Sequence, residues 1–155
     1  MSIQATMNAF KNKIEDKVAE EVEQQFDVIA SYAVYVAVPD QSIDTGAYVT
    51  SFSIGPAGFG GGRSRSSKNK PKNQNPQAMK DQAYSQLVAD IDRIDFEAML
   101  ESGNARFTLR NRAPHARDVE DGANWKRSGY HVFAKIRNQF GWVFTMTFVP
   151  LLRAT

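Results

Sequence analysis

Residues 5–36 read ATMNAFKNKIEDKVAEEVEQQFDVIASYAVYV, the longest periodic segment of the chain. Apolar side chains recur in it at steps of three and four residues, which is the spacing of one face of an α-helix. These apolar positions are Met7, Phe10, Ile14, Val18, Val22, Phe26, Ile29 and Ala33. The segment therefore predicts a long N-terminal helix, roughly 45 Å in length given the rise per residue of an α-helix.

A helix of that length exceeds the core of a small domain, so two interpretations stay open. Either part of the apolar face packs on a neighbouring subunit, or the whole face belongs to one long core helix with a frayed end. The end of the segment is also ambiguous, because the run from Tyr32 to Val38 is rich in β-prone residues and could continue as extended chain. Pro39 ends the segment in both cases.

Shorter patterns predict the remaining elements. We expect strands at Thr50–Ile54 and Ala105–Asn111, and a second helix from Pro76 to Ile94. The buried face of that helix comprises Met79, Ala83, Leu87, Ile91 and Ile94. Phe96–Leu100 extends this helix or forms a separate turn, Tyr130–Phe140 is a helix or a strand, and Trp142–Val149 alternates as a final strand would. The pattern predicts an α+β fold, with a small antiparallel or mixed sheet packed against the long N-terminal helix and the second helix.

The composition is that of a globular chain. With 155 residues, 42% hydrophobic and 23% charged, it predicts a single domain over residues 1–155. The formal net charge of +2 does not indicate a protein that binds nucleic acid over its whole surface. The absence of cysteine excludes disulfides, thiolate chemistry and cysteine-based zinc sites. No signal peptide or membrane-spanning run is visible, so we expect a soluble protein in a reducing compartment.

The segment from Gly55 to Gln77, called the basic arm below, differs from the rest of the chain. It is rich in Gly, Ser, Asn and Pro and contains no acidic residue. Its five cations are Arg63, Arg65, Lys68, Lys70 and Lys72, and removing their +5 from the total of +2 leaves −3 for the other residues. Because the basic arm can bury little apolar surface, we expect a mobile loop. Three roles are open for the basic arm: a solubilising loop, a contact for nucleic-acid phosphates, or a segment that orders against an acidic protein surface.

A short motif, Asp44-Thr45-Gly46-Ala47, precedes the first predicted strand. Aspartic proteases carry Asp-Thr-Gly at the catalytic aspartate, and their dimeric forms place one motif in each chain. That class is nearly all β and its motif follows an apolar strand, whereas the residues before Asp44 are polar. The alternative is that Asp44 caps a short helical turn or an Asx turn, with its carboxylate accepting backbone N–H groups.

A second motif, NRAPHARDVEDG, occupies Asn111–Gly122. It predicts the end of a strand, a single helical turn that begins at Pro114, and a stop at Gly122. Neither this motif nor the separated His115 and His131 has the spacing of a metal site, and no serine lies in a nucleophile elbow. We therefore expect no catalytic, metal or cofactor site, and a protein that is not an enzyme.

Together the two motifs resemble those of the tail-completion (head–tail joining, neck) proteins of long-tailed bacteriophages. That family has a long N-terminal helix, a Pro/Val-Asp-Thr-Gly-x-Leu segment before a strand, and later an Asn-x-x-Pro-Tyr-Ala-x-x-Val-Glu-x-Gly segment. The matching positions here are Asp44, Thr45 and Gly46, and then Asn111, Pro114, Ala116, Val119, Glu120 and Gly122. Their order and spacing agree to about Phe140, while His115 stands where the family has tyrosine.

The resemblance implies a structural virion protein of the neck, assembled in the host cytoplasm. Its copies would form a hexameric ring that joins the tail tube to the head connector around the DNA channel. The implied partners are other copies, the connector or stopper, and the tube or terminator, with DNA contact through the arm and no membrane. The alternatives are a tail terminator of the same neck, a small nucleic-acid-binding module that uses the arm, and the aspartic protease at Asp44.

Overall fold

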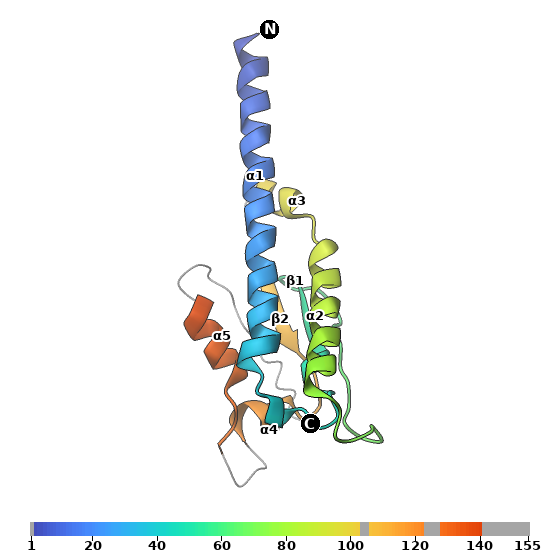
Figure 1. Ribbon diagram of the computed structural model, residues 1–155. Helices are drawn as coiled ribbons and strands as arrows, with labels where there is room; N and C mark the ends of the chain where they lie inside the picture. Colours follow the sequence, from blue (N-terminus) through green and yellow to red (C-terminus); the bar gives the residue numbers. More distant parts are fainter. Residues whose placement is uncertain (1, 103–105, 123–127, 141–155) are drawn as a thin grey trace.

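The computed structural model describes residues 2–102, 106–122 and 128–140. It confirms the α+β class: a two-stranded antiparallel sheet packs with a long N-terminal helix and a second helix (Figure 1). The helices are α1 (Ile3–Tyr32), α2 (Pro76–Asp92), α3 (Phe96–Glu101), α4 (Ala116–Asp121) and α5 (Val132–Phe140), and the strands are β1 (Phe52–Pro56) and β2 (Phe107–Asn111). The final strand predicted for Trp142–Val149 lies outside the described residues.

Helix α1 is the predicted long helix and runs for 30 residues. The Ser2 hydroxyl accepts a hydrogen bond from the Ala5 N–H at 3.1 Å and so caps its first turn. At its other end the β-prone run stays helical, as a π-helical turn over Ala33–Ala37. This turn packs against α5 and buries small apolar side chains, and burial outweighs their β propensity. The chain becomes extended only at Val38, directly before Pro39.

The sheet pairs β1 with β2 in the register Phe52↔Asn111 to Pro56↔Phe107. Its first strand begins two residues later than predicted, because Val49–Ser51 forms a 3₁₀ turn. The Thr50 hydroxyl donates to the Gly46 carbonyl at 2.7 Å, and the Ser51 hydroxyl donates to the Ala47 carbonyl at 2.6 Å. Such hydroxyl bonds to the carbonyl four residues earlier favour a turn over a strand.

The second helical region divides where the chain offers capping side chains. Helix α2 starts at Pro76 after Asn75, whose side chain accepts the Ala78 N–H at 3.0 Å, so the last residues of the predicted arm belong to this helix. It ends at Asp92 rather than Ile94, and Asp95 caps a separate helix α3 by accepting the Ala98 N–H at 3.0 Å. The ambiguous region before Phe140 is helical, as α5.

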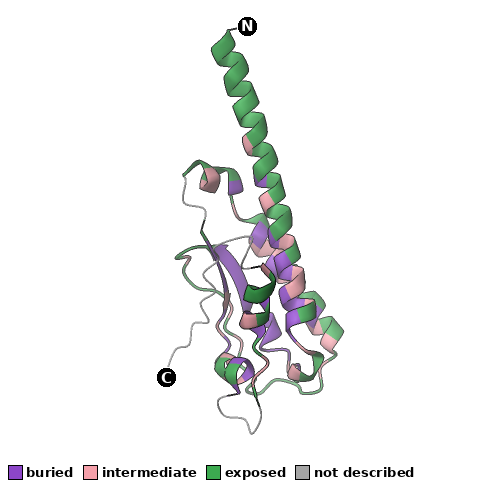
Figure 2. Cartoon of the chain, turned by 90° about the vertical axis from the view of Figure 1, so that its left-hand side faces the viewer, coloured by how far each residue is buried: buried purple, intermediate pink, exposed green. Residues whose placement is uncertain are grey.

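The hydrophobic core lies around the C-terminal half of α1. Phe26 is 1% exposed and its ring centroid lies 4.3 Å from that of Phe107 and 5.5 Å from that of Phe96. The N-terminal half of α1, by contrast, extends beyond the other elements and is exposed along its length (Figures 1 and 2). The apolar face of this helix is therefore core at one end and open surface at the other.

Candidate functional site

Asp44, the residue that matches a protease aspartate, holds the end of the basic arm. Its side-chain Oδ1 accepts the Asn73 N–H at 2.9 Å, and its main-chain oxygen accepts the Gln74 N–H at 2.9 Å. The Asp44 carboxylate thus accepts a backbone N–H as expected, but from a segment 29 residues away, which differs from the local helix cap or Asx turn that the sequence predicts. Gly46 has φ 72°, and a Cβ there would collide with the Met79 side chain on α2. The motif ties the arm and α2 to the turn before β1.

Asn111 joins the two sequence motifs. Its side chain is 1% exposed, and its Nδ2 donates to the Tyr48 carbonyl at 2.8 Å, directly after the Asp44–Ala47 motif. Its Oδ1 accepts the Ala113 N–H at 3.0 Å, which turns the chain out of β2. A side-chain amide can donate through its nitrogen and accept through its oxygen at the same time. The hydrogen bond from Asn111 to Tyr48 therefore places the Asp44–Ala47 motif next to the Asn111–Gly122 motif in the fold.

Replacing Asn111 with alanine is expected to lower the free energy of unfolding by about 2 kcal/mol, because the buried Ala113 N–H loses its partner and the Tyr48 carbonyl keeps only the Ser51 N–H. Urea unfolding followed by circular dichroism measures this change. Asn12→Ala is the matched control, since Asn12 is exposed on α1 and its replacement should change stability by less than about 0.5 kcal/mol. Equal midpoints for the two variants would contradict the role given to Asn111.

Glu120 and Gly122 position α5. The Glu120 carboxylate is 8% exposed and accepts the Phe133 N–H at 3.0 Å, so it occupies the N-terminal end of that helix. Gly122 ends α4 with φ 69°, as the sequence predicts. The prediction for Pro114 is wrong in detail: α4 starts at Ala116 with His115 as its N-terminal cap, so Pro114 precedes the helix and is not its first residue.

An interior polar cluster lies behind this turn. The His115 and Tyr48 ring centroids are 6.4 Å apart, and burial lowers the pKa of His115 against a smaller opposing effect of Asp118. Burial raises the pKa of Glu120, and burial together with the Glu120 charge raises that of Tyr48. Burial in this cluster therefore disfavours the charged forms of these side chains, and the backbone N–H groups at the start of α5 oppose this effect at Glu120.

The His115 shift predicts a pH effect on stability. As the pH falls through 6.5, the unfolded chain binds a proton at His115 that the folded chain resists, so the free energy of unfolding decreases. The raised pKa of Glu120 has the opposite effect, because it increases the free energy of unfolding as the pH falls toward 4.5. Both the wild type and the His115→Tyr variant contain Glu120, so comparing their stabilities at pH 7.5 and 5.5 cancels this contribution. We expect the wild type to lose more stability than the variant over this range. Identical losses in urea unfolding would disprove the prediction.

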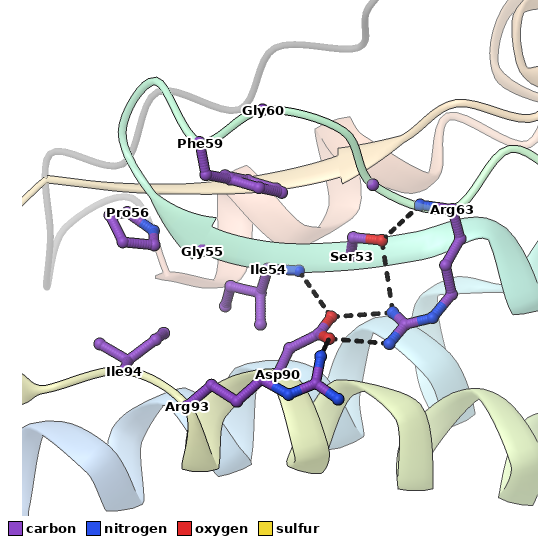
Figure 3. Close-up of a pocket in the computed structure, with 11 residues that line it drawn as sticks. Ser53, Ile54, Gly55, Pro56, Phe59, Gly60, Arg63, Asp90, Arg93 and Ile94 are labelled. Carbon is purple, nitrogen blue, oxygen red and sulfur yellow. Dashed lines mark hydrogen bonds and ion pairs between the residues drawn. The ribbon is translucent and has the colours of Figure 1, made fainter.

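Two cations of the basic arm are used inside the molecule. The Arg63 guanidinium donates to both carboxylate oxygens of Asp90 at 2.7 and 2.8 Å and to the Phe52 carbonyl at 2.7 Å (Figure 3). Arg65 donates from Nε to the Thr50 carbonyl at 3.2 Å. Of the five candidate interaction cations, Arg63 and Arg65 therefore make contacts within the chain. Lys68, Lys70 and Lys72 are exposed.

The start of the arm is fastened to β2. The Arg110 guanidinium lies 4.3 Å from the Phe59 ring centroid and donates to the Phe59 carbonyl at 2.8 Å. Arg112 donates to the Gly61 carbonyl at 2.7 Å. A pocket of about 420 Å³ lies between this loop, β1 and the end of α2 (Figure 3). The carboxylate in this pocket is that of Asp90, and it is already paired with Arg63 of the arm. The pocket lining therefore contains no unpaired acidic side chain.

Within the described ranges, no group of three or more His, Asp or Glu residues could hold a metal ion. None of the helices there is both long and apolar enough to cross a bilayer. The chain matches no family model, no curated protein and no solved structure. In the described fold, the N-terminal half of α1 is an extended exposed surface.

The large apolar side chains that are exposed in the described part of the chain all lie on α1 or its π-helical turn. They are Ile3, Met7, Phe10, Ile14, Val18, Val28 and Val36. The sequence left open whether this stripe meets a neighbour or the chain's own core. The structure divides it: Phe26 and Ile29 are buried, whereas Phe10 is 65% exposed. A long apolar stripe without cover is typical of an interaction surface.

Proposed function

We propose that this chain is a structural virion protein of the phage neck, in a hexameric ring that joins the tail tube to the head connector around the DNA channel. The observation that carries the proposal is the N-terminal half of α1, which leaves the domain with its apolar stripe uncovered. Burying such a stripe requires another protein surface. A ring of identical subunits supplies one at every position.

The arrangement of the two motifs supports the same proposal. Asp44, Gly46, Asn111 and Glu120 are used to fasten segments of the chain to one another, through hydrogen bonds to backbone groups and close packing. The residues that resemble the tail-completion family are thus explained as parts of a scaffold. A scaffold role agrees with a protein that is not an enzyme, and no observation favours proteolysis at Asp44.

The exposed part of the arm is assigned to contacts beyond the ring. Lys68, Lys70 and Lys72 are exposed within a segment whose ends, at Gly61 and Asn73, are hydrogen-bonded to the rest of the fold. Three cations without an acidic neighbour in the arm suit an acidic face of the connector or tube, or DNA in the channel. A tail terminator of the same neck would use these features in the same way.

The second candidate function is a small nucleic-acid-binding module, which the same three lysines favour. If the isolated protein bound DNA through them, affinity would fall with salt with a logarithmic slope of about −3. The neck proposal predicts weak DNA binding by the free chain. A measurement of binding to a duplex at several salt concentrations separates the two functions.

The proposal is tested by deleting the gene in a phage that encodes this chain. We expect DNA-filled heads and finished tails that accumulate without joining, because the ring between them is missing. Restoring the wild-type chain from a plasmid should restore joined particles. Normal particles without the chain would contradict the proposed function.

A further inference from the structure

We propose that the N-terminal half of α1 inserts into the groove between α1 and α2 of a second copy of this chain. The inference rests on the proposed ring and states which surfaces form it. The groove has a volume of about 520 Å³ and lies beside the buried half of α1. Its lining combines an acidic rim of Glu20, Glu23, Asp27 and Asp92 with the apolar side chains of Val28 and Val88.

Charge complementarity identifies the occupant. Residues 3–13 of α1 carry Lys11 and Lys13 and no acidic side chain, and they form the positive end of the helix dipole. No basic residue lines the groove. Lys11 has only an exposed pair with Glu15 at 3.5 Å, which contributes little and leaves the ammonium available. The cationic first part of the helix, residues 3–13, therefore meets an anionic groove.

The apolar surfaces also correspond. Ile3, Met7 and Phe10 are 61–81% exposed and lie on one face of the helix. The distance along the helix axis from Ile3 to Phe10 is about 10 Å. Val28 in the groove is 49% exposed, although Ile91 beneath it is buried. Inserting the helix would cover both sets of side chains while the lysines meet the acidic rim.

The occupant must belong to another copy. Helix α1 is continuous from Ile3 to Tyr32, so its own N-terminal half points away from the groove that its C-terminal half forms (Figure 1). The two surfaces are different patches of one chain, so insertion that passes from each copy to the next in one direction forms a heterologous interface. Such interfaces close into rings when the rotation between copies permits, as the proposed neck ring requires.

The test exchanges the charges of the two surfaces. The variants are Lys11→Glu/Lys13→Glu and Glu20→Lys/Glu23→Lys, all at exposed positions where circular dichroism should show a native fold. Each variant alone opposes like charges, so we expect self-association measured by analytical ultracentrifugation to weaken at least about a hundredfold. Mixing the two variants should restore it, because each helix then faces a groove of opposite charge. Lys11→Arg/Lys13→Arg, which keeps the charge, should associate like the wild type.

Three results would overturn the inference. The first is a wild type that stays monomeric at every concentration. The second is that the wild type associates and both charge-reversed variants associate equally well. A neck ring would then be formed by other contacts. The third is a closed dimer of the wild type that does not grow, because insertion that passes from each copy to the next, as the proposed ring requires, would continue beyond two subunits. The gene-deletion experiment measures whether heads and tails join, so it tests the proposed function independently of these three results.

Discussion

Asp90→Ala is expected to lower the free energy of unfolding by about 3 kcal/mol, because it leaves the Arg63 guanidinium without its counter-charge. The Asp90 side chain is only 11% exposed, and it accepts both Arg63 bonds and the Ile54 N–H at 3.2 Å. The same carboxylate therefore holds the arm, the first strand and the second helix together. Removing it separates three segments at once.

Arg93→Ala is the control for this change. Arg93 lies 4.0 Å from the same carboxylate but is 79% exposed, so its loss should change stability by less than about 0.5 kcal/mol. Hydrogen exchange should also become faster over residues 60–66 in Asp90→Ala and not in Arg93→Ala. Similar unfolding midpoints for the two variants would show that the arm is not held by Asp90.

Phe26→Ala is expected to cost about 3–5 kcal/mol, the range for removing a buried aromatic side chain from a packed core. Phe26 contacts the rings of Phe96 and Phe107, so its loss opens a cavity where α1, α3 and β2 meet. Urea unfolding measures the change. A loss below about 1 kcal/mol would mean that this end of α1 does not form the core.

Phe10→Ala makes the same substitution sixteen positions earlier on the same helix. Phe10 is exposed, so the free energy of unfolding should change by less than about 0.5 kcal/mol. Its expected effect is on self-association, because the docked helix would lose an apolar contact. Phe10→Ala that destabilises the monomer as much as Phe26→Ala would contradict the division of α1 into a core half and an interaction half.

The features predicted from sequence are those that local physics determines. The periodicity of α1, the Gly122 stop of α4 and Pro76 at the first position of α2 depend on neighbours a few residues away. Helix α2 buries Ala83, Leu87 and Ile91 as predicted. The predicted strand is present as β2 over Phe107–Asn111, although its burial does not alternate, because Thr108 is buried together with Phe107 and Leu109. Ala105 lies outside the described residues.

The features that sequence did not predict depend on contacts between distant segments. Composition made the arm look free, yet Arg63 finds Asp90 27 residues later and Arg110 finds Phe59 51 residues earlier. The net charge of a segment does not distinguish an arginine that is paired within the fold from a lysine that is exposed. The groove between α1 and α2 was missed for the same reason, because Asp92 of its acidic rim lies more than 60 residues after the rim residues on α1.

The central claim is that copies of this chain form the ring between head and tail. Cryo-electron microscopy of virus particles whose genome encodes the chain tests it most directly. The account predicts a sixfold ring of density at the head–tail junction, into which the described fold fits with α1 against the neighbouring copy. Joined particles in which this junction is built from other proteins, with the chain absent from purified particles by mass spectrometry, would contradict it.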